Sequence, residues 1–142
     1  YEKTMENGMN KKVTEPYLVD ALSFTEAEAR IIEEMTPFIS GEFTVSDIKR
    51  ANYSELFPCE EDAADRWFKC KLVFITLDEK SGAEKKTSTQ VLVQAADLRD
   101  AVKKLDEGMK GTMADYQIAS VAETAIMDVY PYSAEPNDKP EV

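Results

Sequence analysis

The sequence predicts an α+β fold made of two tandem copies of a ββαβ(β) unit, each with an antiparallel sheet and one helix, related by a pseudo-two-fold axis. Three observations predict it. Residues 80–131 resemble residues 6–58 along most of their length. Alternating apolar runs, typical of strands, precede a stretch with helical apolar spacing. A polar turn with a glycine occupies the same place in both halves.

The two halves align without a gap from Gly8 on Gly82 to Met35 on Met109. After a one-residue deletion the match resumes with Glu42 on Asp115. The apolar positions match as well as the identities, which argues against chance similarity. The other identical pairs are Lys11/Lys85, Lys12/Lys86, Leu18/Leu92, Val19/Val93, Ala21/Ala95, Ala27/Ala101 and Glu33/Glu107. We therefore divide the chain into a first repeat at 1–58, an acidic connector at 59–66, a second repeat at 67–132 and a disordered tail at 133–142.

A hairpin is predicted at the start of the second repeat. Trp67–Leu77 is a run of strand-forming residues, and Thr87–Ala95 returns after a polar turn in which Gly82 supplies a positive φ. Alternate residues of a strand project to the same face, and in the first run four apolar residues share one face: Phe68, Cys70, Leu72 and Phe74.

A helix follows in each repeat. Asp97 is the expected N-cap in the second repeat, and Thr25 with Glu28 forms a capping-box pattern in the first. The apolar stripe of the second helix has helical spacing: Leu98, Ala101, Val102, Leu105 and Met109. The first repeat has apolar residues at four equivalent positions: Phe24, Ala27, Ile31 and Met35.

The last element of each repeat fits either a strand or a helix. The spacing within Tyr116–Tyr130 suits a helix, whereas residues 43–49 and 53–57 of the first repeat are strand-forming. We favour one bent strand or two strands, with a shift in the alternation, such as a bulge, near Ser46 and Ser120.

The first repeat is incomplete in the alignment. Trp67–Val73 has no counterpart there, because Tyr1 aligns near Phe74. Without that strand, the next strand of the first repeat would expose an unpaired edge. We therefore expect the native protein to carry about seven more residues ahead of Tyr1 that supply it.

The composition of the chain argues against several classes of function. The net charge of −11 weighs against nucleic acid, although a local basic patch would overcome it. The absence of histidine removes the commonest general base and the usual zinc ligand. The two cysteines, Cys59 and Cys70, are too far apart for a C-x-x-C motif. No apolar run reaches a membrane-spanning length, and no signal peptide is visible. We therefore expect a cytoplasmic protein with no catalytic, cofactor or metal site and no membrane partner.

The most informative surface residues are a tryptophan and six lysines. Trp67, Lys69 and Lys71 share the face of the first strand opposite to the apolar face. Aromatic stacking beside lysines is how several modules bind single-stranded nucleic acid. Alternatively, the tryptophan packs against the other repeat and the lysines blunt a sheet edge. The remaining lysines form pairs at equivalent places: Lys11 with Lys12, and Lys85 with Lys86.

Three segments resemble an uncharacterised bacterial family common among Bacteroidetes, domain of unknown function 4494. They are Trp67-Phe68-x-Cys70-Lys71, the Leu-Val-x-Ala runs at 18–21 and 92–95, and Asp128-Val-Tyr-Pro-Tyr132. The resemblance extends through Tyr132. It implies a cytoplasmic bacterial protein whose relatives open with Trp-Phe-x-Cys-Lys, and it brings no activity or site residues.

Three functions remain open at this point. The first is a non-enzymatic interaction module that binds another protein or a second copy of itself. The second is a nucleic-acid-associated module that uses the Trp67, Lys69 and Lys71 face. The third is a small-molecule or enzymatic cleft between the repeats, with carboxylates as acid and base.

Overall fold

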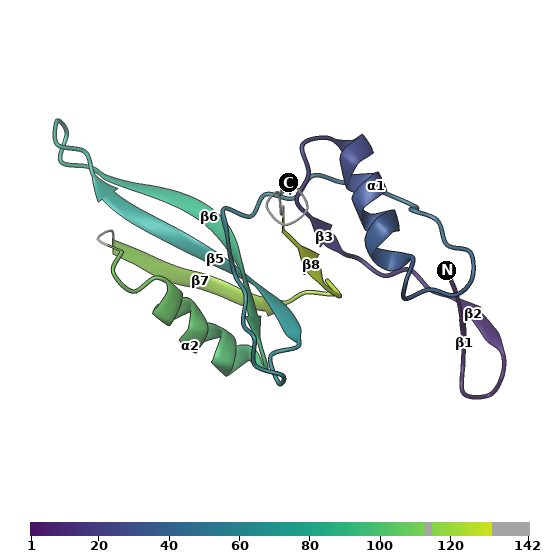
Figure 1. Cartoon of the computed structure of the whole chain (residues 1–142). Coiled ribbons are helices and arrows are strands. Elements are labelled where there is room, and N and C mark those ends of the chain that lie inside the picture. Colours follow the sequence, from purple (N-terminus) through teal and green to yellow (C-terminus); the bar gives the residue numbers. More distant parts are fainter. Residues whose placement is uncertain (113–114, 132–142) are drawn as a thin grey trace, which may run out of the picture. The chain divides into compact units, whose positions relative to one another are not determined.

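The computed structural model of the chain describes residues 1–112 and 115–131 (Figure 1). These residues form an α+β protein with two helices and mixed sheets, so the predicted fold class is confirmed at that level. They divide into two compact units. Unit 1 holds residues 1–50 together with the stretch from Ile126, and unit 2 holds residues 51–125. The tail predicted at residues 133–142 lies outside the described residues.

Unit 2 contains a four-stranded sheet in the order β4-β6-β5-β7. Strands β5 (Arg66–Leu77) and β6 (Glu84–Ala95) form a long antiparallel hairpin, and β7 (Asp115–Glu123) pairs antiparallel with the other edge of β5. Gly82 has a φ of 71° in the turn, which a residue with a side chain rarely adopts. The predicted hairpin and its glycine turn are therefore confirmed.

One face of this sheet packs against α2 (Leu98–Gly108). The predicted apolar face of β5 is confirmed, because Phe68, Cys70 and Leu72 are all buried. Leu105 from α2 is fully buried in the same cluster. The core of unit 2 therefore lies between α2 and the β5–β6 hairpin.

Strand β7 contains the predicted bulge. Lys71 lies opposite Ser120, whereas its neighbour Leu72 lies opposite Ile118, so Ala119 is an extra residue on β7. A bulge shifts the alternation and thereby explains the mixed apolar spacing that also suited a helix. The structure therefore confirms a strand here, with the parity shift next to Ser120.

Unit 1 is built from shorter elements. Strands β1 (Glu2–Thr4) and β2 (Asn10–Lys12) form a small antiparallel hairpin, followed by β3 (Leu18–Val19) and α1 (Phe24–Met35). Strand β3 pairs in parallel with β8 (Val129–Tyr130), near the end of the described chain.

The prediction of purely antiparallel sheets is wrong. Strand β4 (Glu55–Phe57) runs parallel to β6, as β8 runs parallel to β3. The members of each parallel pair are far apart in sequence, and such long connections allow the chain to return in the same direction. Alternating residues fix which face a strand buries, but not the direction of its neighbour.

The two helices begin in the same way. Asp97 is the N-cap of α2, as predicted, and its side chain accepts a hydrogen bond of 2.8 Å from the Asp100 amide. In α1 the N-cap is Ser23, which accepts from the Glu26 amide at 3.1 Å. The predicted capping box at Thr25 is therefore wrong by two residues, because Ser23 already holds the extended conformation of an N-cap.

Residues 42–50 follow α1 and correspond to β7 in the alignment. Their burial alternates in the same order as that of β7, with Phe43, Val45 and Ile48 half-buried. Among the described residues, however, they pair with no strand. Among the described residues, this burial pattern therefore belongs to a paired strand only in unit 2, where β7 pairs with β5.

Candidate functional site

The face of β5 that carries Trp67, Lys69 and Lys71 is only partly open to solvent. Trp67 is buried, with 4% of the residue exposed, whereas Lys69 is half-buried and Lys71 is exposed. Stacking on a nucleic-acid base requires an accessible ring face. This indole has no such face in the described conformation.

The lysines of the second hairpin point to opposite faces of the sheet. Lys86 lies opposite Ile75 and so shares the face of Lys69 and Lys71, because directly paired residues project to the same side. Lys85 lies opposite Thr76 and projects to the other side. The structure therefore places Lys69, Lys71 and Lys86 on one face and separates Lys85 from them.

The lysines of the first hairpin belong to unit 1. Lys12 lies opposite Glu2, so a carboxylate is its directly paired neighbour. Lys11 lies opposite Lys3, and both residues are exposed. The predicted lysine pairs thus occupy equivalent hairpin positions, but each pair splits between the two faces of its ladder.

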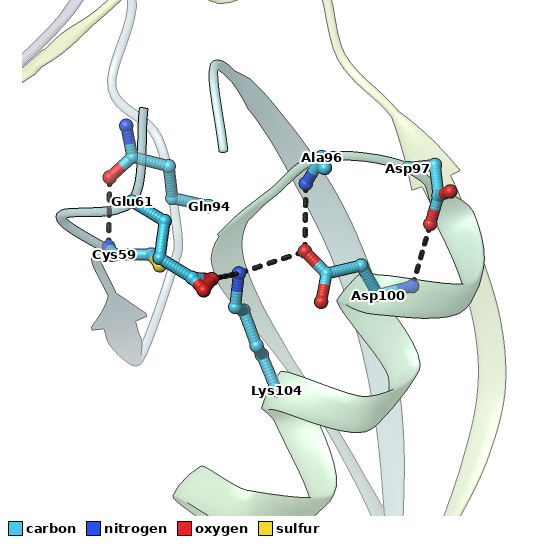
Figure 2. A network of polar contacts seen from close by, with 7 residues as sticks. All are labelled: Cys59, Glu61, Gln94, Ala96, Asp97, Asp100 and Lys104. Carbon is cyan, nitrogen blue, oxygen red and sulfur yellow. Dashed lines mark hydrogen bonds and ion pairs between the residues drawn. The ribbon is translucent and has the colours of Figure 1, made fainter. Parts of the chain in front are cut away.

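A polar network centred on Lys104 joins the acidic connector to the first turn of α2 (Figure 2). The ammonium of Lys104 contacts Asp100 Oδ2 at 2.8 Å and Glu61 Oε1 at 3.0 Å. Asp100 also accepts a 2.9 Å hydrogen bond from the Ala96 amide. Beside it, the Cys59 amide donates to Gln94 Oε1 at 2.9 Å. Sequence reasoning missed this network, since only the i,i+4 spacing of Asp100 and Lys104 signalled it.

The charges in this network stabilise one another. Hydrogen bonds from the Ala96 amide and then from Lys104 hold the pKa of Asp100 below its ordinary value. The hydrogen bond to Asp100, followed by that to Glu61, raises the pKa of Lys104. Every charged member already has a partner within the network. We therefore interpret it as a structural staple that fixes the connector to α2.

Replacing Asp100 by Asn should weaken the acid sensitivity of the fold. The pKa of Asp100 is depressed in the folded state, so its stabilising effect is present above the unfolded value of 3.8 and is lost as pH falls through the folded value. Urea unfolding at pH 7 and pH 3 measures this. The loss on acidification should be smaller in Asp100→Asn than in wild type, while Glu107→Gln on the same helix should behave as wild type. Equal losses in all three would contradict the staple.

A second cluster that the sequence did not signal lies in unit 1. The rings of Tyr17 and Tyr130 stack with centroids 6.1 Å apart, and the Tyr17 hydroxyl donates to Glu15 at 3.1 Å. Burial, with Glu15 next in effect, raises the pKa of Tyr17. The Tyr130 hydroxyl also contacts the Met35 sulfur at 3.7 Å. These contacts hold β8 against Tyr17 and Met35 of unit 1.

Reactive and metal-binding groups are not gathered in the described residues. Cys70 is fully buried as predicted, and burial raises the pKa of its thiol to about 11, away from the reactive thiolate. Within residues 1–112 and 115–131, no three carboxylates or thiols lie close enough to hold a metal ion. Neither described helix has the length and apolar character that a membrane crossing would require.

These features define a small α+β protein of two compact units whose most organised polar groups serve the fold. The chain belongs to the family described as a domain of unknown function (DUF4494), whose model matches residues 1–132. The resemblance noted from the sequence is thereby confirmed. No curated protein and no solved structure matches the chain.

Proposed function

We propose that the chain is a cytoplasmic, non-enzymatic protein-interaction module built from a tandem duplication of one α+β unit. The duplication is supported by matched local geometry. Gly8 and Gly82, which align, have φ values of 83° and 71°. The helix starts also match in a reciprocal bond: Glu26 accepts from the Leu22 amide, as Asp100 accepts from the Ala96 amide. These matched features at aligned positions support the proposed duplication.

An apolar surface on unit 1 carries the proposal of an interaction module. It consists of α1 and its flanking residues, and its large side chains are exposed. Leu22 is 86% exposed and Phe38 is 76% exposed. The others are Phe24 at 56% and Ile32 at 42%. We call these four residues the α1 apolar surface. Large exposed apolar side chains that gather on one surface commonly mark a contact with another protein, and we propose that these four, all within residues 22–38, act in this way.

The second repeat does not keep this surface. The residues aligned with Leu22 and Ile32 are Ala96 and Asp106, whereas Phe38 falls in the stretch that contains the one-residue deletion. Only the position of Phe24 stays large and apolar, as Leu98. A feature that follows from the fold alone would be found in both copies, so its presence in one copy supports a binding role. Both cysteines are free, which fits a reducing compartment.

Substituting Phe24 and Phe38 by Ser should abolish binding to a protein partner or to a second copy. Each change removes a large apolar side chain from the α1 apolar surface without emptying a core site. The double variant should lose a partner recovered by the wild-type chain in affinity capture, or shift from dimer to monomer by light scattering. Leu98→Ser is the matched control, because Leu98 is 50% exposed at the position aligned with Phe24. A wild-type chain that is monomeric and captures nothing would refute the proposal.

A further inference from the structure

Each repeat ends in a short strand that pairs with the other repeat. Strand β4 closes the first repeat but adds to β6, with Leu56 opposite Leu92. Strand β8 closes the second repeat but adds to β3, with Val129 opposite Leu18. We call β4 and β8 the closing strands, and β3 and β6 the acceptor strands. Both ladders are parallel, and each lies wholly inside one compact unit.

The two pairings are equivalent residue by residue. The alignment places Leu18 on Leu92 and Leu56 on Val129, so the same two positions meet in both ladders. The hydrogen bond that precedes each ladder is also conserved. The Ser54 amide donates to Gln90 O at 2.8 Å, and the Met127 amide, at the aligned position, donates to Pro16 O at 2.8 Å. Independent contacts would not be expected to agree in register and in flanking bond.

We propose that the repeats hold each other by a reciprocal exchange of closing strands within one chain, and that at high concentration each acceptor strand takes the closing strand of a second copy instead. The inference rests on the duplication proposed above. The chain passes between the units at Arg50/Ala51 and again at Ala125/Ile126, so each unit is completed by a strand from the other repeat. A strand that is exchanged within one chain can be exchanged between two chains with the same contacts. A second copy of this chain therefore offers β8 the same ladder that β3 offers within one chain.

The contacts that hold β8 in unit 1 support its exchange between two chains as one segment. Beyond its two-residue ladder, β8 is held by the stack of Tyr130 on Tyr17 and by the hydrogen bond from Tyr130 to Met35. Arg30 adds a 3.1 Å bond to the carbonyl of Pro131. All of these partners lie in unit 1, so a second chain offers β8 the same set of contacts.

Paired cysteines in the full chain test the exchange. The background is Cys59→Ser, with Cys70 retained because it is buried and poorly ionised. Leu18→Cys with Val129→Cys should form a disulfide within one chain after refolding at micromolar concentration and oxidation. Ser54→Cys with Thr89→Cys should do the same in unit 2, because their hydroxyls lie 2.8 Å apart.

The matched control pairs a closing strand with the acceptor strand of its own repeat. Leu18→Cys with Leu56→Cys should remain reduced under the same conditions. If this pair closes as readily as Leu18→Cys with Val129→Cys, the exchange is overturned. Refolding the Leu18/Val129 variant at near-millimolar concentration should convert most of the intrachain product into covalent dimer. A chain that stays monomeric at every concentration overturns the second copy as partner. Neither outcome depends on Phe24 or Phe38. The disulfide experiments therefore test the strand exchange alone, and the Phe24/Phe38 double variant tests the α1 apolar surface.

Discussion

Fusing the sequence of Arg66–Val73 directly in front of Tyr1 should stabilise unit 1 by about 2–5 kcal/mol, the balance of apolar burial and chain ordering. Glu2 lies opposite Lys12 as Ile75 lies opposite Lys86, so Tyr1 corresponds to Phe74 and the fusion preserves the register of β5. The added strand would lie beside residues 42–50, whose burial pattern already matches that of β7. Urea unfolding would measure the gain, and hydrogen exchange would show protection of the Phe43–Ile48 amides.

The control for this fusion changes register and leaves composition almost intact. Fusing the sequence of Trp67–Phe74 instead shifts the strand by one residue, which moves its apolar set to the opposite face. This fusion should give little protection to residues 43–48 and little gain in stability. Equal behaviour of the two fusions would contradict the proposed duplication.

Leu105→Ala should destabilise the protein by roughly 2–5 kcal/mol, because it removes a fully buried side chain and leaves a cavity. Leu105 lies in the cluster between α2 and the β5–β6 hairpin, with Phe68 and Val93 among its members. Urea or thermal unfolding monitored by circular dichroism would measure the loss.

Two matched variants make this prediction specific. Leu98→Ala lies on the same helix and removes the same atoms, but Leu98 is half exposed, so its cost should stay below about 1 kcal/mol. Ile31→Ala occupies the position aligned with Leu105, and Ile31 is only half-buried. Its cost should fall between the other two. If Leu98→Ala and Leu105→Ala cost the same, the assigned core of unit 2 is wrong.

Local signals in the sequence predicted the elements of unit 2 well. Residues close in sequence determine three of these features: the alternation of β5, the positive φ of Gly82 and the cap of α2 at Asp97. The strand in 115–123 was also predicted, together with its bulge. The cap of α1 was misplaced because Ser23 and Thr25 are both good cap residues, and only the local backbone selects between them.

What the sequence could not predict depends on contacts between distant residues. The parallel direction of β4 and β8 is decided by where each strand docks, and no pattern within a strand encodes that. The Lys104 network was missed because Glu61 is far from Asp100 in sequence. The sequence also could not predict the burial of Trp67, because tryptophan occurs both in protein interiors and on surfaces.

The position of β8 near the end of the described chain has a consequence for biosynthesis. Ribosomes release the chain from its N-terminus, so the strands of unit 2 are all available once Glu123 has emerged. Unit 1 starts to emerge first, yet it must wait for Val129 and Tyr130 before β3 has its partner. During that interval β3 lacks its ladder partner, and the incompletely folded unit exposes apolar surface. Loss of only the residues after Ile126 should therefore leave unit 2 intact while unit 1 fails to mature.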